Sequence, residues 1–234
     1  MAKTTLQKCL KLHKLFVAET ARSSKLESEG SQVLSSLANL SQRLPILLQS
    51  GNATHGQGSD TVDDDVSDVM GVLRDVRETP TLLLQKHFLA LEKSREFLTD
   101  IMRDYQELLR HLRSFASECV TLVDDALIED ETAVSEDDQL AAVAFPLQLQ
   151  EWMETVLAMF EHEVLRKTRL VADLEYSDSP RLSTMYSQWS AQGIMGNIDS
   201  NYVQTGLPLP RATTSSTLPS RQSKSNASKR KKKK

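Results

Sequence analysis

The most regular pattern of apolar positions runs through the middle of the chain. Between residues 84 and 126, apolar or aromatic side chains recur at alternating steps of four and three, with one charged exception. The series is Leu84, Phe88, Leu91, Arg95, Leu98, Met102, Tyr105, Leu109, Leu112, Ala116, Cys119, Val123 and Ala126. No glycine or proline interrupts it, so it predicts one face of a long helix. A helix of this length cannot hide its stripe alone, and it must pair with other helices or with a partner.

Local signals bound this central region, which we assign to residues 66–127. A short apolar helix is expected over residues 66–76, before the long one. Thr79-Pro80 then has the form of a helix start, because proline is favoured at the first helical position. Upstream, residues 51–65 are rich in glycine and polar residues, which predicts a flexible linker.

The N-terminal helical region, residues 1–50, carries two apolar series that do not share a phase. The first series is Leu6, Leu10, His13 and Val17, and the second is Val33, Leu37, Leu40, Leu44 and Leu47. A polar stretch containing Gly30 separates them, so we expect a break or kink near Gly30. Pro45 is expected to end or bend the second part.

The C-terminal third divides into three parts. Residues 128–144 are predicted to form an exposed acidic linker, because residues 124–138 include eight acidic side chains. Residues 145–195 form a C-terminal helical module, whose first helix opens at Phe145-Pro146. Its second, short helix is expected to begin with Asp178 as its cap and Pro180 in its first turn. Residues 196–234 lack apolar periodicity and are predicted to be a disordered basic tail.

Composition agrees with these elements and narrows the fold class. Leu, Glu, Lys, Ser and Gln dominate, aromatic residues are 5% of the chain, and β-branched runs are scarce. We therefore predict an all-α protein, an elongated antiparallel helical bundle or coiled coil with a disordered basic tail. The two cysteines fall inside helical patterns and imply no disulfide framework. No apolar run reaches the roughly 18 residues that a membrane span needs, so a soluble, intracellular chain is expected.

The sequence offers no signature of catalysis. It has no glycine-rich phosphate loop and no nucleophile elbow. His162-Glu163 resembles the start of a zinc helix, but Arg166 stands where the second histidine would be. We therefore expect no catalytic residue, no cofactor, no metal site and no enzymatic activity.

The chain ends in a basic cluster formed by Lys229, Arg230, Lys231, Lys232, Lys233 and Lys234. Its position at the end of a flexible tail favours a nuclear import signal. Two alternatives are contact with RNA or the ribosome through counterion release, and a tail that only increases solubility. No aromatic residue lies between these lysines, so base stacking does not support the nucleic-acid alternative.

Two pairs of residues have both a structural and a functional interpretation. Trp152 and Trp189 fit core anchors between the last two helices, but tryptophan is also enriched at binding hot spots. Thr79 and Ser179 each precede a proline and are candidate phosphorylation sites. Both prolines also fit helix starts, and the two interpretations are compatible, since phosphate is favoured at a helix N-terminus.

The segment from 145 to 190 resembles the C-terminal part of the cyclin-dependent kinase 2-interacting protein family. The resemblance lies in the spacing of an aromatic residue, a charged helical strip, a leucine-ended turn, an Asp-Pro pair and a Tyr-x-x-Trp motif. These correspond to Met159-Phe160, Glu163-Val164-Leu165-Arg166-Lys167, Val171-Ala172-Asp173-Leu174, Asp178 with Pro180, and Leu182, Tyr186, Ser187 and Trp189. Residues 33–40 also resemble a small helical ribosome-maturation factor, so which of two related subunits is matched stays open.

The resemblance implies a nuclear adaptor without catalytic activity. It implies as partners a cyclin-dependent kinase, AAA ATPase subunits and a second small helical subunit, with roles in DNA replication, the DNA-damage checkpoint, cell division and ribosome biogenesis. On this basis the candidate partner-binding residues are Trp152, Phe160, Glu163, Arg166, Lys167, Tyr186 and Trp189. The strip of Glu163, Arg166 and Lys167 fits partner contact or a solvated face. The basic tail is not a family feature.

The sequence therefore predicts a protein-binding adaptor of a nuclear complex. Two alternatives remain: a self-associating coiled-coil scaffold, and an RNA- or ribosome-binding factor that acts through its tail. Nucleic acid contact is expected only through the tail, and no membrane contact is expected.

Overall fold

A computed structural model describes residues 2–52, 79–130, 136–176, 178–190 and 197–209 of the chain. This part is helical and contains no strand, which confirms the all-α prediction. Its helices are α1 (Ala2–Asn52), α3 (Thr79–Asp130), α4 (Glu136–Ala172), α5 (Ser179–Trp189) and α6 (Ser200–Thr205).

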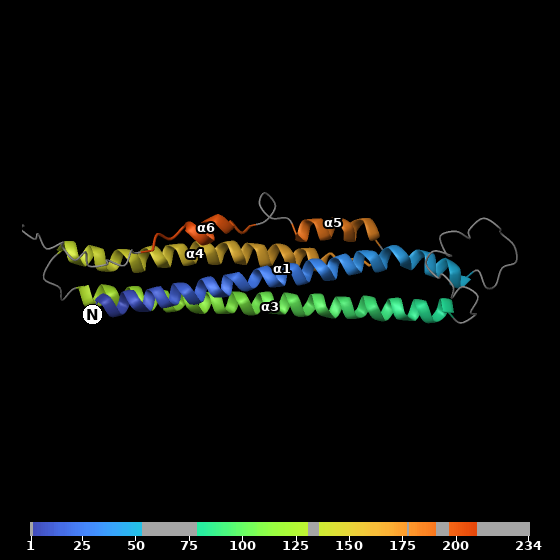
Figure 1. Ribbon diagram of the computed structural model, residues 1–234, viewed down its shortest axis with the longest axis horizontal. Coiled ribbons are helices and arrows are strands. Elements are labelled where there is room, and N and C mark those ends of the chain that lie inside the picture. The colour runs from blue at the N-terminus through green and yellow to red at the C-terminus, as the bar shows by residue number, and fades with distance from the viewer. Residues whose placement is uncertain (1, 53–78, 131–135, 177, 191–196, 210–234) are drawn as a thin grey trace, which may run out of the picture.

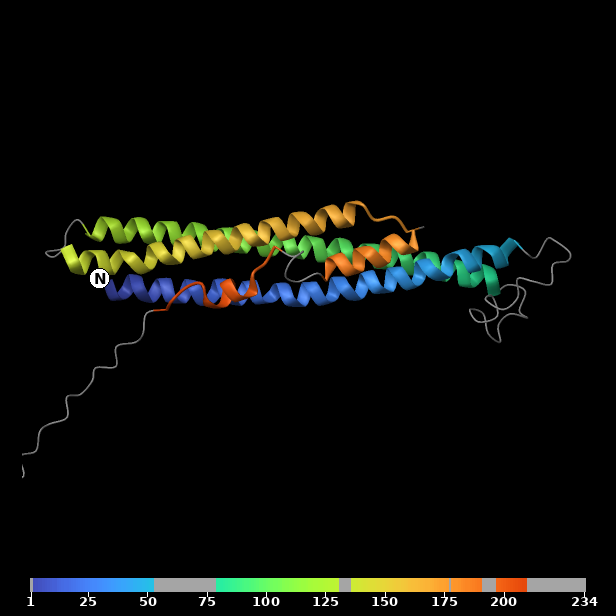
Figure 2. The same ribbon diagram turned by 90° about the horizontal axis from the view of Figure 1, so that it is seen from above.

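The three long helices lie side by side along the long axis of the molecule (Figure 1). Helix α3 runs antiparallel to α1, and α4 returns along α3 in the direction of α1 (Figures 1 and 2). Helix α1 packs against α3, α4 and α5, and α3 packs against α4. The two short helices lie on the outside of this layer, with α5 running back along α1 (Figure 2).

The core lies between the long helices and uses the predicted stripe of α3. Leu98, Tyr105, Leu112 and Cys119, seven residues apart, are each at most 2% exposed. They meet apolar residues of α1 and α4, among them Phe16 and Val156, in one continuous cluster. The stripe of α3 is thus covered largely within the chain, and the long helix finds its packing partners there.

Two expected interruptions of the first helix are absent. The sequence predicted a break or kink near Gly30 and an end or bend at Pro45. Helix α1 runs without a break through both residues to Asn52, so the break at Gly30 and the end at Pro45 are wrong. At Gly30 the missing side chain makes room for the Trp189 indole rather than loosening the helix. Proline removes one backbone hydrogen bond, and the exposed Pro45 leaves Leu47, 1% exposed, in its buried place.

The acidic linker predicted for residues 128–144 is largely helical. Helix α3 continues to Asp130, and α4 begins at Glu136, ten residues before Pro146. Each helix has a buried apolar side chain near this end, Ala126 in α3 and Val143 in α4, so packing supports both helices close to the acidic residues. The predicted opening of the helix at Phe145-Pro146 is therefore wrong.

The predicted disordered tail begins with an ordered segment. Helix α6 lies within it, capped by Asp199, whose side chain accepts hydrogen bonds from the Asn201 and Tyr202 backbones. Leu207, 7% exposed, belongs to the core cluster. The apolar positions here are too few to show a period, which is why the sequence pattern missed this helix.

Two other helix starts agree with expectation. Helix α3 begins at Thr79, and α5 begins at Ser179 with Pro180 in its first turn. The Asp178 carboxylate accepts a hydrogen bond of 2.9 Å from the Arg181 backbone, as an N-cap should. The short helix expected over residues 66–76, most of the 51–65 linker and the basic cluster lie outside the described residues.

Candidate functional site

The most elaborate polar arrangement in the described part of the chain lies beneath the C-terminal end of α5. Trp189, the last residue of α5, is 1% exposed, and its indole Nε1 donates a 3.1 Å hydrogen bond to the Glu27 carbonyl of α1. A side chain at Gly30 would collide with this indole, so glycine is what allows α5 to approach α1. The ring also meets Tyr105 of α3 edge-on, with 6.2 Å between centroids. One tryptophan thus joins three helices.

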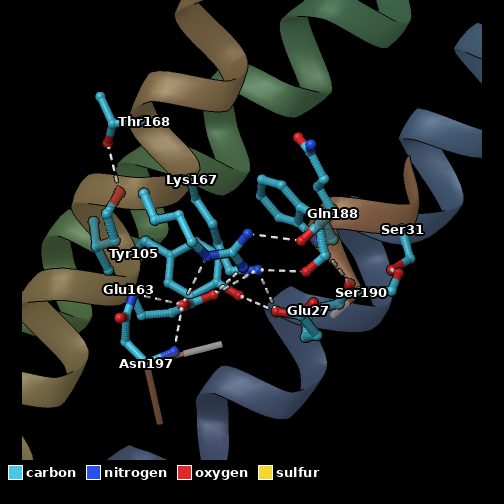
Figure 3. Close-up of polar contacts among 12 residues, drawn as sticks. Glu27, Ser31, Tyr105, Glu163, Lys167, Thr168, Gln188, Ser190 and Asn197 are labelled. Carbon is cyan, nitrogen blue, oxygen red and sulfur yellow. Dashed lines mark hydrogen bonds and ion pairs between the residues drawn. The ribbon is translucent and has the colours of Figure 1, made fainter. Parts of the chain in front are cut away.

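A fully buried lysine, Lys167, lies against this tryptophan. Figure 3 shows Lys167 with Glu27, Glu163 and Tyr105 around it. The Lys167 side chain is 1% exposed, and its Nζ is 2.6 Å from a carboxylate oxygen of Glu27 and 3.2 Å from one of Glu163. Nζ also donates a 3.1 Å hydrogen bond to the Trp189 carbonyl and lies 4.0 Å from the centre of the Trp189 ring. A cation at the C-terminal end of α5 interacts favourably with the helix dipole and with the aromatic face.

Arg166 and Asn197 complete the arrangement around Glu163. Arg166 donates to both oxygens of the Glu163 carboxylate and, through its other terminal nitrogen, to the Gln188 carbonyl of α5 at 2.7 Å. The backbone and side-chain amides of Asn197 donate to the same carboxylate, at 3.1 and 3.3 Å. Arg166 therefore ties α4 to α5, and Glu163 ties α4 to the segment before α6. We call the set Glu27, Tyr105, Glu163, Arg166, Lys167 and Trp189 the α5 cluster.

The electrostatic environment of the α5 cluster shifts two pKa values in opposite directions. Burial, the largest influence, acts to raise the pKa of Glu163, but the Arg166 and Asn197 hydrogen bonds and the charge of Lys167 together bring this pKa below its ordinary value. Burial raises the pKa of the Tyr105 hydroxyl, and so do the negative charge of Glu27 and the hydrogen bond that Tyr105 donates to it. The cluster therefore favours an ionised Glu163 beside a neutral Tyr105.

The charged groups of the α5 cluster are already paired within the protein. Its carboxylates and cations contact one another and the carbonyls of α5, at the centre of the packing between helices. Nearby, an open depression of about 410 Å³ is lined by Thr155, Ala158, Met159, His162 and Asn197. Among the described residues, no three His, Cys, Asp or Glu side chains are placed to hold a metal ion. What the cluster does physically is hold helices together.

None of the helices in the described ranges combines the length and apolar character needed to cross a bilayer.

The structure places most of the predicted partner-binding residues inside the protein. Phe160, Glu163, Lys167 and the two tryptophans are each at most 5% exposed. Arg166 is mostly covered, and Tyr186 alone of the seven is exposed, at 40%. Trp152 packs against His13 and Phe16 of α1 and donates to the Tyr202 carbonyl of α6 at 3.3 Å. Both tryptophans are therefore core anchors. Trp152 of α4 packs against α1, and Trp189 of α5 contacts α1 and α3 as well as Lys167 of α4.

Sequence reasoning missed the partners of this cluster in α1 and α3. Glu27 and Gly30 lie in the polar stretch that suggested a break, and Tyr105 was assigned only to the apolar stripe. Neither apolar period nor charge pattern shows that residue 27 meets residue 167. The candidate phosphorylation sites Thr79 and Ser179 are half-buried at the first positions of α3 and α5.

Comparison with known proteins adds no relative, because no family model, curated protein or solved structure matches this chain. The resemblance to the cyclin-dependent kinase 2-interacting protein family stays a prediction from the residues quoted above.

Replacing the buried ammonium should strongly destabilise the fold. Lys167→Met keeps the length of the side chain but removes the cation that Glu27 and Glu163 share, which leaves Glu163 with Arg166 alone and Glu27 without a cation in the α5 cluster. We expect the free energy of unfolding to fall by about 3–5 kcal/mol, measured by urea denaturation followed by tryptophan fluorescence.

An exposed ion pair that also joins two of the long helices, α3 and α4, provides the control. Arg113 of α3 and Glu161 of α4 pair at 2.8 Å, but their side chains are 55% and 38% exposed. Arg113→Met should cost no more than about 1 kcal/mol. A Lys167→Met variant that is destabilised no more than Arg113→Met would contradict the structural role of the α5 cluster.

The pKa of Glu163 predicts a loss of stability in acid. A carboxyl whose pKa is lower in the folded than in the unfolded protein stabilises the fold at pH values above its ordinary value of 4.5. That contribution disappears as the pH falls through the folded-state pKa. We expect the difference in free energy of unfolding between wild type and Glu163→Gln to be constant above pH 5 and to shrink below about pH 4.5. Urea titrations at several pH values measure it, and a difference that stays constant to pH 3 would contradict the assignment.

Proposed function

We propose that this protein is a non-enzymatic adaptor, an elongated antiparallel helical bundle that binds other proteins. The observation that carries the proposal is the set of large apolar side chains that remain exposed after the core is filled. The described residues include thirteen such side chains, and seven of them lie on α3. The full set is Leu15, Leu48, Leu82, Phe88, Leu89, Phe97, Val120, Leu127, Ile128, Leu147, Leu165, Tyr186 and Leu209. On α3 they gather near the two ends of the helix, four within residues 82–97 and three within 120–128, and exposed apolar side chains that gather in this way are typical of protein-binding sites.

The sequence resemblance supplies the setting of the proposal. We place the adaptor in a nuclear complex with AAA ATPase subunits, a second small helical subunit and a cyclin-dependent kinase. DNA replication, its checkpoint and ribosome maturation are the processes it would serve. Nuclear import through the cluster of residues 229–234 belongs to the same proposal.

The internal use of the α5 cluster supports an adaptor over an enzyme. Catalytic groups need a free face toward a substrate, whereas Lys167 and Glu163 are occupied by one another and by α5. The packing of α3 against α1 and α4 weighs against the alternative in which this stripe forms a dimer, because most of it is already covered.

Affinity purification tests the proposal. A tagged full-length chain, recovered from nuclear extract after nuclease treatment, should bring AAA ATPase subunits in stoichiometric amounts, identified by mass spectrometry. Size-exclusion chromatography with light scattering should show the purified chain as a monomer. Recovery of the chain alone as a dimer would support the scaffold instead, and recovery of only nuclease-sensitive ribosomal proteins would support RNA binding through the tail.

A further inference from the structure

Among the described residues, no third helix covers the end of the bundle where α1 ends and α3 begins. Ser41 of α1 donates a 2.8 Å hydrogen bond to the Tyr176 carbonyl, where the chain passes from α4 to α5. Beyond this point α1 and α3 continue side by side past both α4 and α5 (Figure 2). We call this two-helix end, residues 42–52 of α1 and 79–95 of α3, the arm.

The exposure of α3 shows where the cover stops. Positions seven apart lie on one face of a packed helix. Arg113 of α3 pairs with Glu161 of α4, which marks the side of α3 that is turned toward α4. On that side, Ala116 and Leu109, three residues after and four before Arg113, are 9% and 3% exposed. Further along the same line, Met102 is half-buried and Arg95 is exposed. The next position, Phe88, is 47% exposed. The apolar face therefore continues along the arm after α4 has ended.

Helix α1 shows the same change on the face toward α5. Leu34 and Ser41 are 1% and 2% exposed, whereas Leu48, seven residues further, is 44% exposed. Leu44, four residues before Leu48, and Leu84, four residues before Phe88, are half-buried. In the arm, the faces of α3 and α1 that α4 and α5 cover in the rest of the bundle are exposed. This exposed surface therefore continues an interface that the protein already uses.

The charge of the arm indicates what fits there. The arm contains four basic residues, Arg43, Lys86, Lys93 and Arg95, and one acidic residue, Glu92, so its formal charge is +3, in a chain whose formal net charge is -4. Two copies of this surface would repel each other, which disfavours a second copy as the occupant. A helix with an apolar face and acidic flanks satisfies both the exposed apolar residues and the charge.

We propose that the arm binds an acidic amphipathic helix of a partner protein, which lies where α4 would continue. Phe88 and Leu48 would contact the apolar face of that helix, and Arg95 would pair with an acidic flank. The 17 residues from 79 to 95 span about 25 Å, which accommodates about five turns of the partner. This inference rests on the proposed adaptor function and names the surface and partner chemistry through which it acts.

A pair of synthetic helices tests the chemistry directly. The probe is a fluorescent peptide of about 18 residues with leucines on one face and glutamates on the flanks, and its counterpart carries lysines at the flanks. We expect the glutamate peptide to bind the full chain at least tenfold more tightly, measured by fluorescence anisotropy, with affinity falling as salt is added. Equal binding of the two peptides, or no binding, would overturn the proposal.

Matched variants locate the binding surface. Phe88→Ser and Leu48→Ser should each weaken binding of the glutamate peptide at least tenfold, and Leu89→Ser should leave it unchanged. Leu89 is 66% exposed and adjacent to Phe88 in sequence, but it lies on a different face of α3. Arg95→Glu should weaken binding about fivefold, whereas Arg103→Glu, outside the arm, should not. Circular dichroism melting curves identify any variant that fails to fold, and equal effects of Phe88→Ser and Leu89→Ser would overturn the proposal.

A photo-crosslinker at position 88 identifies competing occupants. In the purified full chain, crosslinks to residues 53–78 of the same molecule or to a second copy would each show a different occupant and overturn the proposal. In the nuclear-extract purification, recovery of AAA ATPase subunits equally by wild type and Phe88→Ser would leave the adaptor function standing and overturn the arm as its surface. If the peptide binds through the arm but no AAA ATPase subunits are recovered, the arm stands as a binding surface and the proposed adaptor function is contradicted.

Discussion

The position of α5 in this structure depends on how the buried ammonium group of Lys167 is paired. A lysine side chain at 1% exposure is favourable only where carboxylates and carbonyls replace its water. Here the replacements come from Glu27 of α1, Glu163 of α4 and the last carbonyl of α5. The requirement to satisfy one cation therefore fixes the relative position of three helices, and no shift of α5 along α1 would preserve it.

This arrangement changes the functional meaning of the C-terminal motif. The residues that carry the family resemblance include Trp189, Glu163, Arg166 and Lys167, and they fasten α5 to the body. A sequence pattern of this kind can persist because it holds a short helix in place. If the chain is an adaptor, its partners meet the side chains left outside this fastening, of which Phe88 and Leu48 on the arm are examples.

The sequence predicted helices well and their interruptions poorly. The period of the α3 stripe and the Thr79-Pro80 start were sufficient to locate that helix, because local periodicity and capping depend on neighbouring residues alone. Gly30 and Pro45 were misinterpreted, because the cost of either residue in a helix is decided by what packs on it. The same limit applies to the α5 cluster: Lys167 and Glu27 were visible as charged residues, but their contact is a product of the tertiary fold. Helix α6 gave too short a pattern to predict.

The central claim is that Trp189, seated on Gly30 above Lys167, holds α5 on α1. Hydrogen exchange of the α5 backbone in Gly30→Ala, with Ser28→Ala as the exposed control in the same helix, tests it most directly. Alanine at an ordinary helical position stabilises by about 0.5–1 kcal/mol relative to glycine, so propensity alone predicts slower exchange. The account predicts the reverse: the methyl group displaces the indole, and amides of α5 exchange at least about tenfold faster while those of α3 around Leu112 are unchanged. Exchange in α5 that is unchanged or slower in Gly30→Ala would contradict it.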